Sequence, residues 1–374
     1  MITAALDREL AAALHALISD GALPAHARRI SAAGTWRHSA DGRPATYTTA
    51  LPFHLAGLAG GTPADRAAEL ADRLRRLPWL TTADPAGGYL TLSVTWQKLA
   101  QSVAQMAAVG PASARSTILA GTGAPLADWP DLAAAVTWQG AWQAQAAAMT
   151  GQLALAAGAT PAQRYDRERP GTLPQPARGA GHPAAEIVAY RGADLVRYRL
   201  ARTRPGRVRQ TAAQLRALLP QPGRSAAAAV TQHAGQPEWP GPPQPDPLAA
   251  VREAHLAAAS VSRWAADLRL PRPEVTGALG ALLAHPAERE LLTELSFLPV
   301  AVAAAARRRR PDELPHYLEV LGLTWCSCRL AAPALPFGGR GAPDNPELAS
   351  ARLILADAVR AVLAAGLALT GVGA

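Results

Sequence analysis

Lysine is almost missing from this chain of 374 residues, because Lys98 is the only lysine among its 37 Lys and Arg residues. A single lysine excludes a P-loop lysine together with a K-x-S-K loop for ATP, and it excludes a Schiff base at any position other than residue 98. Against 28 acidic residues, the basic residues give a formal net charge of +9. This surplus favours a polyanionic partner, although a biased genomic base composition would also produce it.

Cysteine is equally scarce, with only Cys326 and Cys328 in the chain. Two thiols cannot build a disulfide framework or fill the four ligand positions of structural zinc. The nearest histidine is His316 and no carboxylate cluster accompanies the pair, so we expect small buried side chains and neither a metal nor another cofactor. The nine histidines are scattered and indicate no catalytic Ser/His/Asp set.

A signal peptide and a membrane span are both missing from the pattern. Charged residues stand at positions 7 to 9, where a signal peptide has an apolar run, so we expect a cytoplasmic protein. The most apolar stretch, Leu353 to Val372, contains Asp357 and Arg360. These charges predict a buried helix and argue against a membrane partner.

Aromatic residues make up only 5% of the chain, whereas hydrophobic residues make up 49%. The core is therefore left to Ala, Leu and Val, and the abundance of Ala and Leu favours helices. We predict a mainly α chain of the α+β class. It should comprise a small α+β N-terminal domain over residues 1–100, a helical remnant and linker over 101–185, and a C-terminal helical bundle over 186–374.

The first hundred residues contain signals for both helices and a strand. Leu6 to Ile18 predicts a helix, and Thr62 with Pro63 is a typical start for an amphipathic helix that runs to Leu77. Tyr89 to Val94 alternates apolar and polar residues, which predicts a strand.

The middle of the chain has little periodicity. Two Ala-rich stretches with Trp129, Trp138 and Trp142 predict helical pieces, and Arg164 to Pro183 has the Pro, Gly and Arg content of a linker. A second Pro-rich break, Gln236 to Pro247, separates two helical blocks.

Gly179 to Ala184 fits a loose dinucleotide-binding fingerprint. It follows a Pro-rich stretch instead of a strand, and Pro183 is poorly placed for the helix that should follow. We therefore interpret it as part of the linker.

Beyond Asp246 the sequence is predominantly helical. Leu248 to Leu268 and Ala287 to Arg310 carry apolar residues at three- and four-residue spacing, and Asn345 caps a last helix with one long apolar face. These segments predict a helical bundle.

Two arginine clusters stand out. Arg307 to Arg310 end a helix, where the dipole favours cations, so a solvated helix end explains them as well as a ligand does. The other cluster would repel itself without anionic partners, which favours phosphate contact. Its six members lie within thirteen residues: Arg197, Arg199, Arg202, Arg204, Arg207 and Arg209.

The run Asp357-Ala-Val-Arg360 lies inside a helical stretch over residues 351–371. Upstream stand His285-Pro-Ala-Glu-Arg-Glu-Leu-Leu292, Phe297-Leu-Pro299, Pro315-His-Tyr-Leu318 and Trp325-Cys-Ser-Cys-Arg329. In this order and spacing they resemble the anticodon-binding domain of arginyl-tRNA synthetases, which is named for a D-A-L-R run. Residues 246–262 resemble another helix of that domain, and residues 192–198 resemble the last part of the family's catalytic domain.

Three stretches of the first hundred residues, Tyr47 to Ala56, Thr62 to Leu74 and Gly88 to Leu92, resemble the N-terminal domain of the same family. The resemblance implies a contact with the tRNA D-arm, which the family makes partly through an Asn. Ala50 stands at that position here.

The catalytic elements of the family are missing between these two ends. The segment is under about 100 residues long, and Leu126-Ala-Asp-Trp-Pro-Asp131 stands where an H-x-G-H element would be. Such an element and the lysine loop stabilise the charge that moves through ATP. The enzyme assignment stays open, but the pattern favours a chain that does not form an aminoacyl adenylate.

The resemblance therefore implies a non-catalytic paralogue that binds tRNA, with an arginine tRNA as the expected ligand. Arginines would contact phosphates, and aromatic side chains would stack on unpaired bases. For each residue the alternative is packing or an internal salt bridge. The candidates are Tyr317, Trp325, Arg329, Arg352, Arg360, Arg197, Arg199 and Arg202.

Two other functions stay open. In one, RNA binding has been lost and the fold contacts a protein, for example a full-length synthetase. In the other, an activity related to aminoacyl-tRNA survives. A contiguous basic face would favour RNA, and an apolar patch would favour a protein partner.

Overall fold

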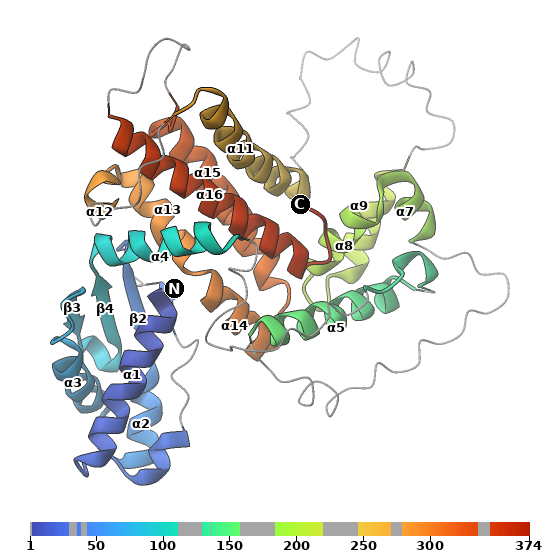
Figure 1. The fold of residues 1–374 in the computed structure, drawn as a ribbon. Coiled ribbons are helices and arrows are strands. Elements are labelled where there is room, and N and C mark those ends of the chain that lie inside the picture. The colour runs from blue at the N-terminus through green and yellow to red at the C-terminus, as the bar shows by residue number, and fades with distance from the viewer. Residues whose placement is uncertain are drawn as a thin grey trace, which may run out of the picture.

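The computed structural model describes residues 2–29, 36–38, 43–110, 129–135, 137–157, 184–219, 246–270, 279–335 and 345–374. Within these ranges most residues are helical, and one four-stranded antiparallel sheet lies in the N-terminal part (Figure 1). The prediction of a mainly helical α+β chain is confirmed. Among the helices of these ranges, none combines the length and apolar character that crossing a membrane requires.

The sheet has the strand order β1-β2-β4-β3. Its strands are β1 (Trp36–His38), β2 (Thr46–Thr49), β3 (Leu80–Asp84) and β4 (Leu90–Val94). In β4, Leu90, Leu92 and Val94 are buried while the residues between them are half-buried, so the alternation read from the sequence does place one face on the core. Three helices accompany the sheet: α1 (Ile2–Ser19), α2 (Leu51–Ala59) and α3 (Pro63–Leu74).

Helix α3 packs against β3 and β4 and begins where the sequence predicts. The Thr62 hydroxyl accepts a hydrogen bond from the Asp65 amide, and the Asp65 carboxylate accepts one from the Thr62 amide. This reciprocal pair satisfies backbone donors that a helix start leaves open. The Thr62 hydroxyl also donates to the Asp65 carboxylate at 2.7 Å, and this bond, together with that from the Thr62 amide, holds the pKa of Asp65 below its usual value.

Helix α4 (Trp96–Val109) leads from the sheet to the bundle. It begins directly after β4, capped by Thr95, and packs on α12 (Leu279–Leu282), α13 (Pro286–Ser296) and α16 (Pro346–Leu369). Residue 100, the predicted domain boundary, lies in the middle of α4. The sheet and the bundle consequently share one hydrophobic core, and the division of the chain into domains stays a prediction.

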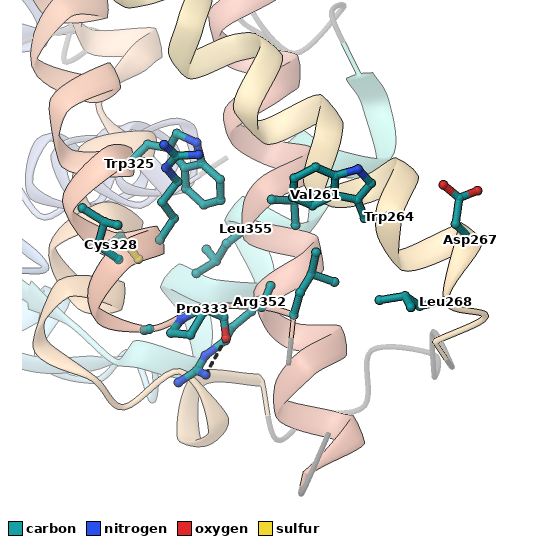
Figure 2. A pocket seen from close by; sticks show the side chains of 14 residues that line it. Val261, Trp264, Asp267, Leu268, Trp325, Cys328, Pro333, Arg352 and Leu355 are labelled. Atoms are coloured by element: carbon teal, nitrogen blue, oxygen red, sulfur yellow. Dashed lines mark hydrogen bonds between the residues drawn. The ribbon is translucent and has the colours of Figure 1, made fainter. Parts of the chain in front are cut away.

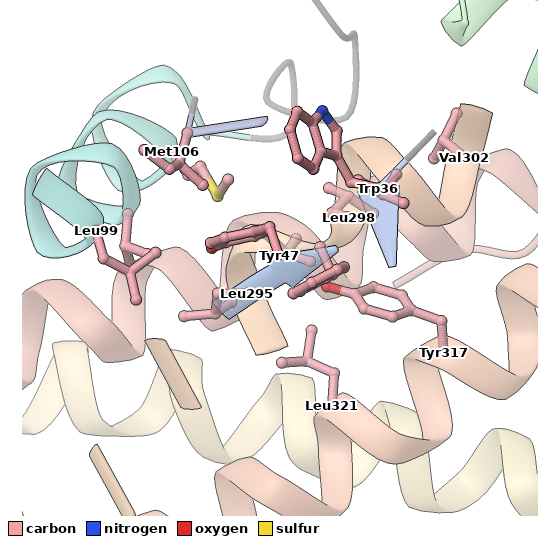
Figure 3. Close-up of a cluster of buried hydrophobic side chains, with 14 of the residues drawn as sticks. Trp36, Tyr47, Leu99, Met106, Leu295, Leu298, Val302, Tyr317 and Leu321 are labelled. Carbon is pink, nitrogen blue, oxygen red and sulfur yellow. The ribbon is translucent and has the colours of Figure 1, made fainter. Parts of the chain in front are cut away.

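A second link between sheet and bundle comes from Tyr47 of β2. Its ring lies among buried side chains of the core (Figure 3). The ring stacks on Phe297 with 5.0 Å between ring centres, and its hydroxyl lies 2.6 Å from the Ser296 hydroxyl. Two residues earlier, the Ala45 amide donates to the Thr293 hydroxyl at 3.0 Å. Burial raises the pKa of Tyr47, so the phenol stays protonated.

The bundle is formed by α11 (Pro247–Asp267), α12, α13, α14 (Leu298–Arg308), α15 (Glu313–Ala331) and α16. Asn345 caps α16 by accepting from the Leu348 amide, as predicted. The apolar segment 287–310 is divided between α13 and α14, with a break at Phe297. Pro299, in the first turn of α14, has no amide proton to continue the preceding helix, so a single helix there would lose a backbone hydrogen bond.

A second, smaller core joins α5 (Trp138–Ala156), α7 (Ala185–Arg191), α8 (Ala193–Ala201) and α9 (Val208–Arg216). Short 3-10 turns occupy residues 25–29, 86–88 and 132–134. Trp129 stands outside any helix and packs on Gly371, where a Cβ atom would overlap its ring, so the helical prediction for this tryptophan is wrong. The linker at 164–183, with most of the 179–184 fingerprint, and residues 236–245 lie outside the described residues.

Close packing between α15 and α16 generates a stability prediction. Gly366 of α16 faces Leu318 of α15, and a Cβ atom at Gly366 would overlap that side chain. Gly366→Ala should therefore lower the free energy of unfolding by about 1–3 kcal/mol, as overpacked cores do. Urea denaturation of both proteins measures the difference.

Gly57 of α2 is the matched control, because a Cβ atom there meets open space. Gly57→Ala should raise the free energy of unfolding by up to about 1 kcal/mol through helix propensity. Equal stabilities of Gly366→Ala and the parent chain would contradict the packing described for α15 and α16.

Candidate nucleic-acid interface

The predicted arginines of the 197–209 cluster find anionic or carbonyl partners inside the chain. Arg197 donates to the Pro130 carbonyl at 3.1 Å, and Arg199 lies 3.2 Å from Asp246. Arg202 forms a two-pronged ion pair with Glu319 of α15, at 2.6 and 3.0 Å. With Arg204, which lies 3.7 Å from Asp312, three of the six arginines face a carboxylate of the chain. Phosphate contact by this cluster stays a prediction.

Arg360 lies on the partly exposed side of α16. Its Nε atom is 3.9 Å from the Asp357 carboxylate, which also accepts a hydrogen bond of 2.6 Å from Ser262 of α11. Burial lowers the pKa of the neighbouring His255, and the charge of Arg360 lowers it further. The D-A-V-R run thus places Asp357 between α11 and α16 and leaves Arg360 accessible to solvent.

Tyr317 belongs to the core. Its ring is buried near Leu295 and Leu321, and its hydroxyl donates to the Glu294 carbonyl at 2.9 Å (Figure 3). Tyr317 is therefore packed in the core, which is the alternative to base stacking that the sequence left open.

Three of the predicted residues, Trp325, Arg329 and Arg352, line one cavity of about 610 Å³. It lies between α11, α15 and α16, and Val261 and Trp264 of α11 face Trp325 and Cys328 of α15 across it (Figure 2). Most of its wall is apolar. A volume of this order is typical of small-molecule sites and leaves room for a planar ring such as a nucleobase.

Two tryptophans in this cavity differ in exposure. Trp325 is 3% exposed, and its Nε1–H has no acceptor among the described residues. Trp264 is 58% exposed. Sequence reasoning did not select Trp264. One signal for an exposed ring was present, because Trp264 lies next to Arg263 and outside the set of buried apolar positions of α11 that ends at Ala265.

Arg329 is the unpaired cation of the cavity. Within the described residues its guanidinium makes no hydrogen bond or ion pair, and its Nε atom is buried without an acceptor. Arg352, in contrast, donates to Glu288 at 2.6 Å and to the Pro333 carbonyl at 2.9 Å (Figure 2). Arg329 therefore has donors free for an anion.

The two cysteines lie on α15 as free thiols, Cys326 half-buried and Cys328 buried. Burial raises the pKa of Cys328 to about 12, so this thiol stays protonated at neutral pH. Its role here is to line the cavity.

An exposed aromatic pair lies on the N-terminal part. The rings of Phe53 and Tyr89 have centres 4.9 Å apart and are 40% and 45% exposed. Gly88 packs so tightly on Phe53 and Pro63 that a side chain there would overlap them. Phe53 stands three residues after Ala50, the position where the family resemblance implies a D-arm contact.

Comparison with known proteins identifies the bundle. Residues 251–374 match the model of the DALR anticodon binding domain. The arginine–tRNA ligase of Micrococcus luteus is 37% identical over 131 residues, and that of Frankia alni is 40% identical over 129 residues. Each match covers 34% of this chain and 23% of the relative. A structural match to the arginyl-tRNA synthetase of Thermus thermophilus covers 100% of this chain and 99% of that chain, with 15% sequence identity and a TM-score of 0.46.

Residues 251–374, which make up most of the helical bundle, are thus similar to DALR anticodon binding domains and to the corresponding part of arginine–tRNA ligases. The matched part spans about a quarter of the length of those relatives.

The Arg352–Glu288 pair generates a second stability prediction. Glu288 is only 1% exposed, so Arg352→Met would leave its carboxylate buried without a cation. Breaking a buried pair by removing one partner costs about 3–5 kcal/mol, which urea denaturation should detect. Arg360→Met is the control and should change stability by less than about 1 kcal/mol, because its pair is long and solvated. If both variants lose the same stability, Arg352 is not the structural residue argued above.

Proposed function

We propose that this protein binds tRNA through its DALR domain and does not aminoacylate it. The observation that carries the proposal is the convergence of Trp264, Trp325 and the unpaired Arg329 on one apolar cavity inside that domain. Sequence-specific proteins usually recognise RNA at loops, where unstacked bases lie on aromatic rings. An anticodon loop offers such bases next to phosphates.

The side chains divide the binding work. The exposed ring of Trp264 offers a stacking surface, which is worth about 1–3 kcal/mol per base. Arg329 offers charged donors for a neighbouring phosphate. Arg360 lies on the next helix with its guanidinium partly exposed and adds positive charge nearby.

The N-terminal part supports a second contact. Phe53 and Tyr89 expose two rings beside the position where related proteins touch the D-arm, and Ala50 lacks the amide that the family uses there. We infer that stacking replaces the amide hydrogen bond. An arginine tRNA is the ligand that homology to arginine–tRNA ligases favours.

A protein partner is the second candidate, favoured by one observation. Val320, Leu323 and Leu330 are 40%, 66% and 73% exposed along one side of α15. Exposed apolar patches of this kind mark interaction surfaces.

Counterion release provides the first test of tRNA binding. If about five phosphates of loop RNA are contacted, the log–log salt slope of the association constant should be near −3 to −4, at roughly 0.7 ions per contact. Filter binding with total tRNA over a range of salt concentrations measures this slope. Absence of binding to any tRNA at low salt would refute the proposal and leave the protein-partner function.

Stacking and charge can be separated in the same assay. Trp264→Ala should weaken tRNA binding about 5- to 100-fold with little change in slope, because stacking releases no counterions. Trp264 is preferred to Trp325 for this test because Trp325 is buried and its loss would also disturb folding.

Catalytic silence is the second functional prediction. Because the chain lacks the histidine pair and the loop lysine, it should form no arginyl-tRNA and exchange no pyrophosphate when given ATP, arginine and tRNA. A mock preparation is the background. Turnover above that background would show that another constellation of residues does the chemistry.

A further inference from the structure

Arg329 separates two cavities. Besides the apolar cavity described above, it lines a second one of about 750 Å³ between α11, the start of α8 and the end of α7. The second cavity has polar walls, including Arg252, Glu253 and Ser260. Since one side chain lines both, the two cavities lie next to each other at Arg329.

The charges of the second cavity are mostly balanced within the chain. Asp194 is bound by Arg252 at 2.5 Å, and Asp246 lies 3.2 Å from Arg199. Glu253 is exposed and, within the described ranges, has no hydrogen bond or ion pair. Arg191 also lines this cavity and donates to the Leu218 carbonyl, with no carboxylate partner among the described residues. The groups on this cavity that keep an unbalanced charge are therefore Arg191 and Arg329, which attract an anion, and Glu253, which repels one.

Arg329 also lines the apolar cavity. The buried Trp325 Nε1–H has no acceptor among the described residues, and Trp264 presents an open ring across from it. A planar ring has room in this space and can stack on the exposed Trp264 ring (Figure 2).

Resting on the proposed function, we propose that the two cavities hold consecutive nucleotides of single-stranded RNA and that Arg329 binds the phosphodiester between them. The base of one nucleotide stacks on Trp264 in the apolar cavity. The ribose of the next occupies the polar cavity, where Ser260 and Arg252 line the wall. The unit recognised is thus a dinucleotide step and not an isolated base.

The test uses the full chain and two single-stranded probes, a labelled hexaadenylate and an abasic hexamer with the same phosphates. Arg329→Gln should weaken hexaadenylate binding about 10- to 100-fold, as expected for a charged hydrogen bond, and should flatten the salt slope by about 0.7. Trp264→Ala should weaken binding of the hexaadenylate but not of the abasic hexamer. Glu253→Gln should strengthen binding of both.

Arg8→Gln is the matched control, because Arg8 is an exposed arginine on α1. It removes the same charge away from the cavities and should leave hexaadenylate binding within about twofold of the parent chain. Arg329→Lys keeps the charge and should retain the salt slope, which separates a phosphate contact from a folding defect.

Three results would overturn the inference. Arg329→Gln could match Arg8→Gln, it could lose affinity with an unchanged salt slope, or the parent chain could bind tRNA but not the hexamer. In each case tRNA binding by the parent chain would leave the proposed function intact. If the parent chain binds neither tRNA nor hexamer, the proposed function itself fails.

Discussion

The position of Tyr47 is the constraint on which the arrangement of the chain depends. This residue belongs to β2, an inner strand of the small sheet. Its ring is fully buried against Phe297 of the bundle, and its hydroxyl forms a hydrogen bond with the Ser296 hydroxyl. A buried phenol without a partner would cost free energy, so the two serine and tyrosine hydroxyls hold each other in place. Helix α4 reinforces the link by packing on α16 directly after the sheet ends.

This shared core has consequences for the surfaces on either side. The Phe53–Tyr89 pair lies on the sheet side of this core. The cavity between α11, α15 and α16 lies on the bundle side. Tyr47 and α4 connect the two sides. In the proposed function the pair and the cavity are the two RNA-binding surfaces, and a common core would keep their relative position on binding and so reduce the entropy lost.

The arginines show how little a charge count says about available charge. In the 197–209 segment, Arg199 and Arg202 pair with Asp246 and with Glu319 of α15, so part of the charge in this run is neutralised inside the chain. Arg352 likewise neutralises the buried Glu288. Arg329 is the last residue of the Trp325 to Arg329 stretch. It is a candidate ligand contact because its guanidinium has no partner among the described residues.

Local elements and the resemblance to arginyl-tRNA synthetases could be read from the sequence alone. Capping residues at Thr62 and Asn345, the alternation in β4 and the D-A-V-R run depend on neighbours a few positions apart, so they can be read directly. The sequence also indicated Trp325, Arg329 and Arg352, which the fold brings to one cavity. Only the tertiary structure decided which arginines are paired, because carboxylates such as Glu319 and Glu288 lie 64 to 117 residues away from them. It also placed Tyr317 in the core and brought Trp264 to the cavity, since burial and exposure depend on which helices pack together, and no local spacing encodes that.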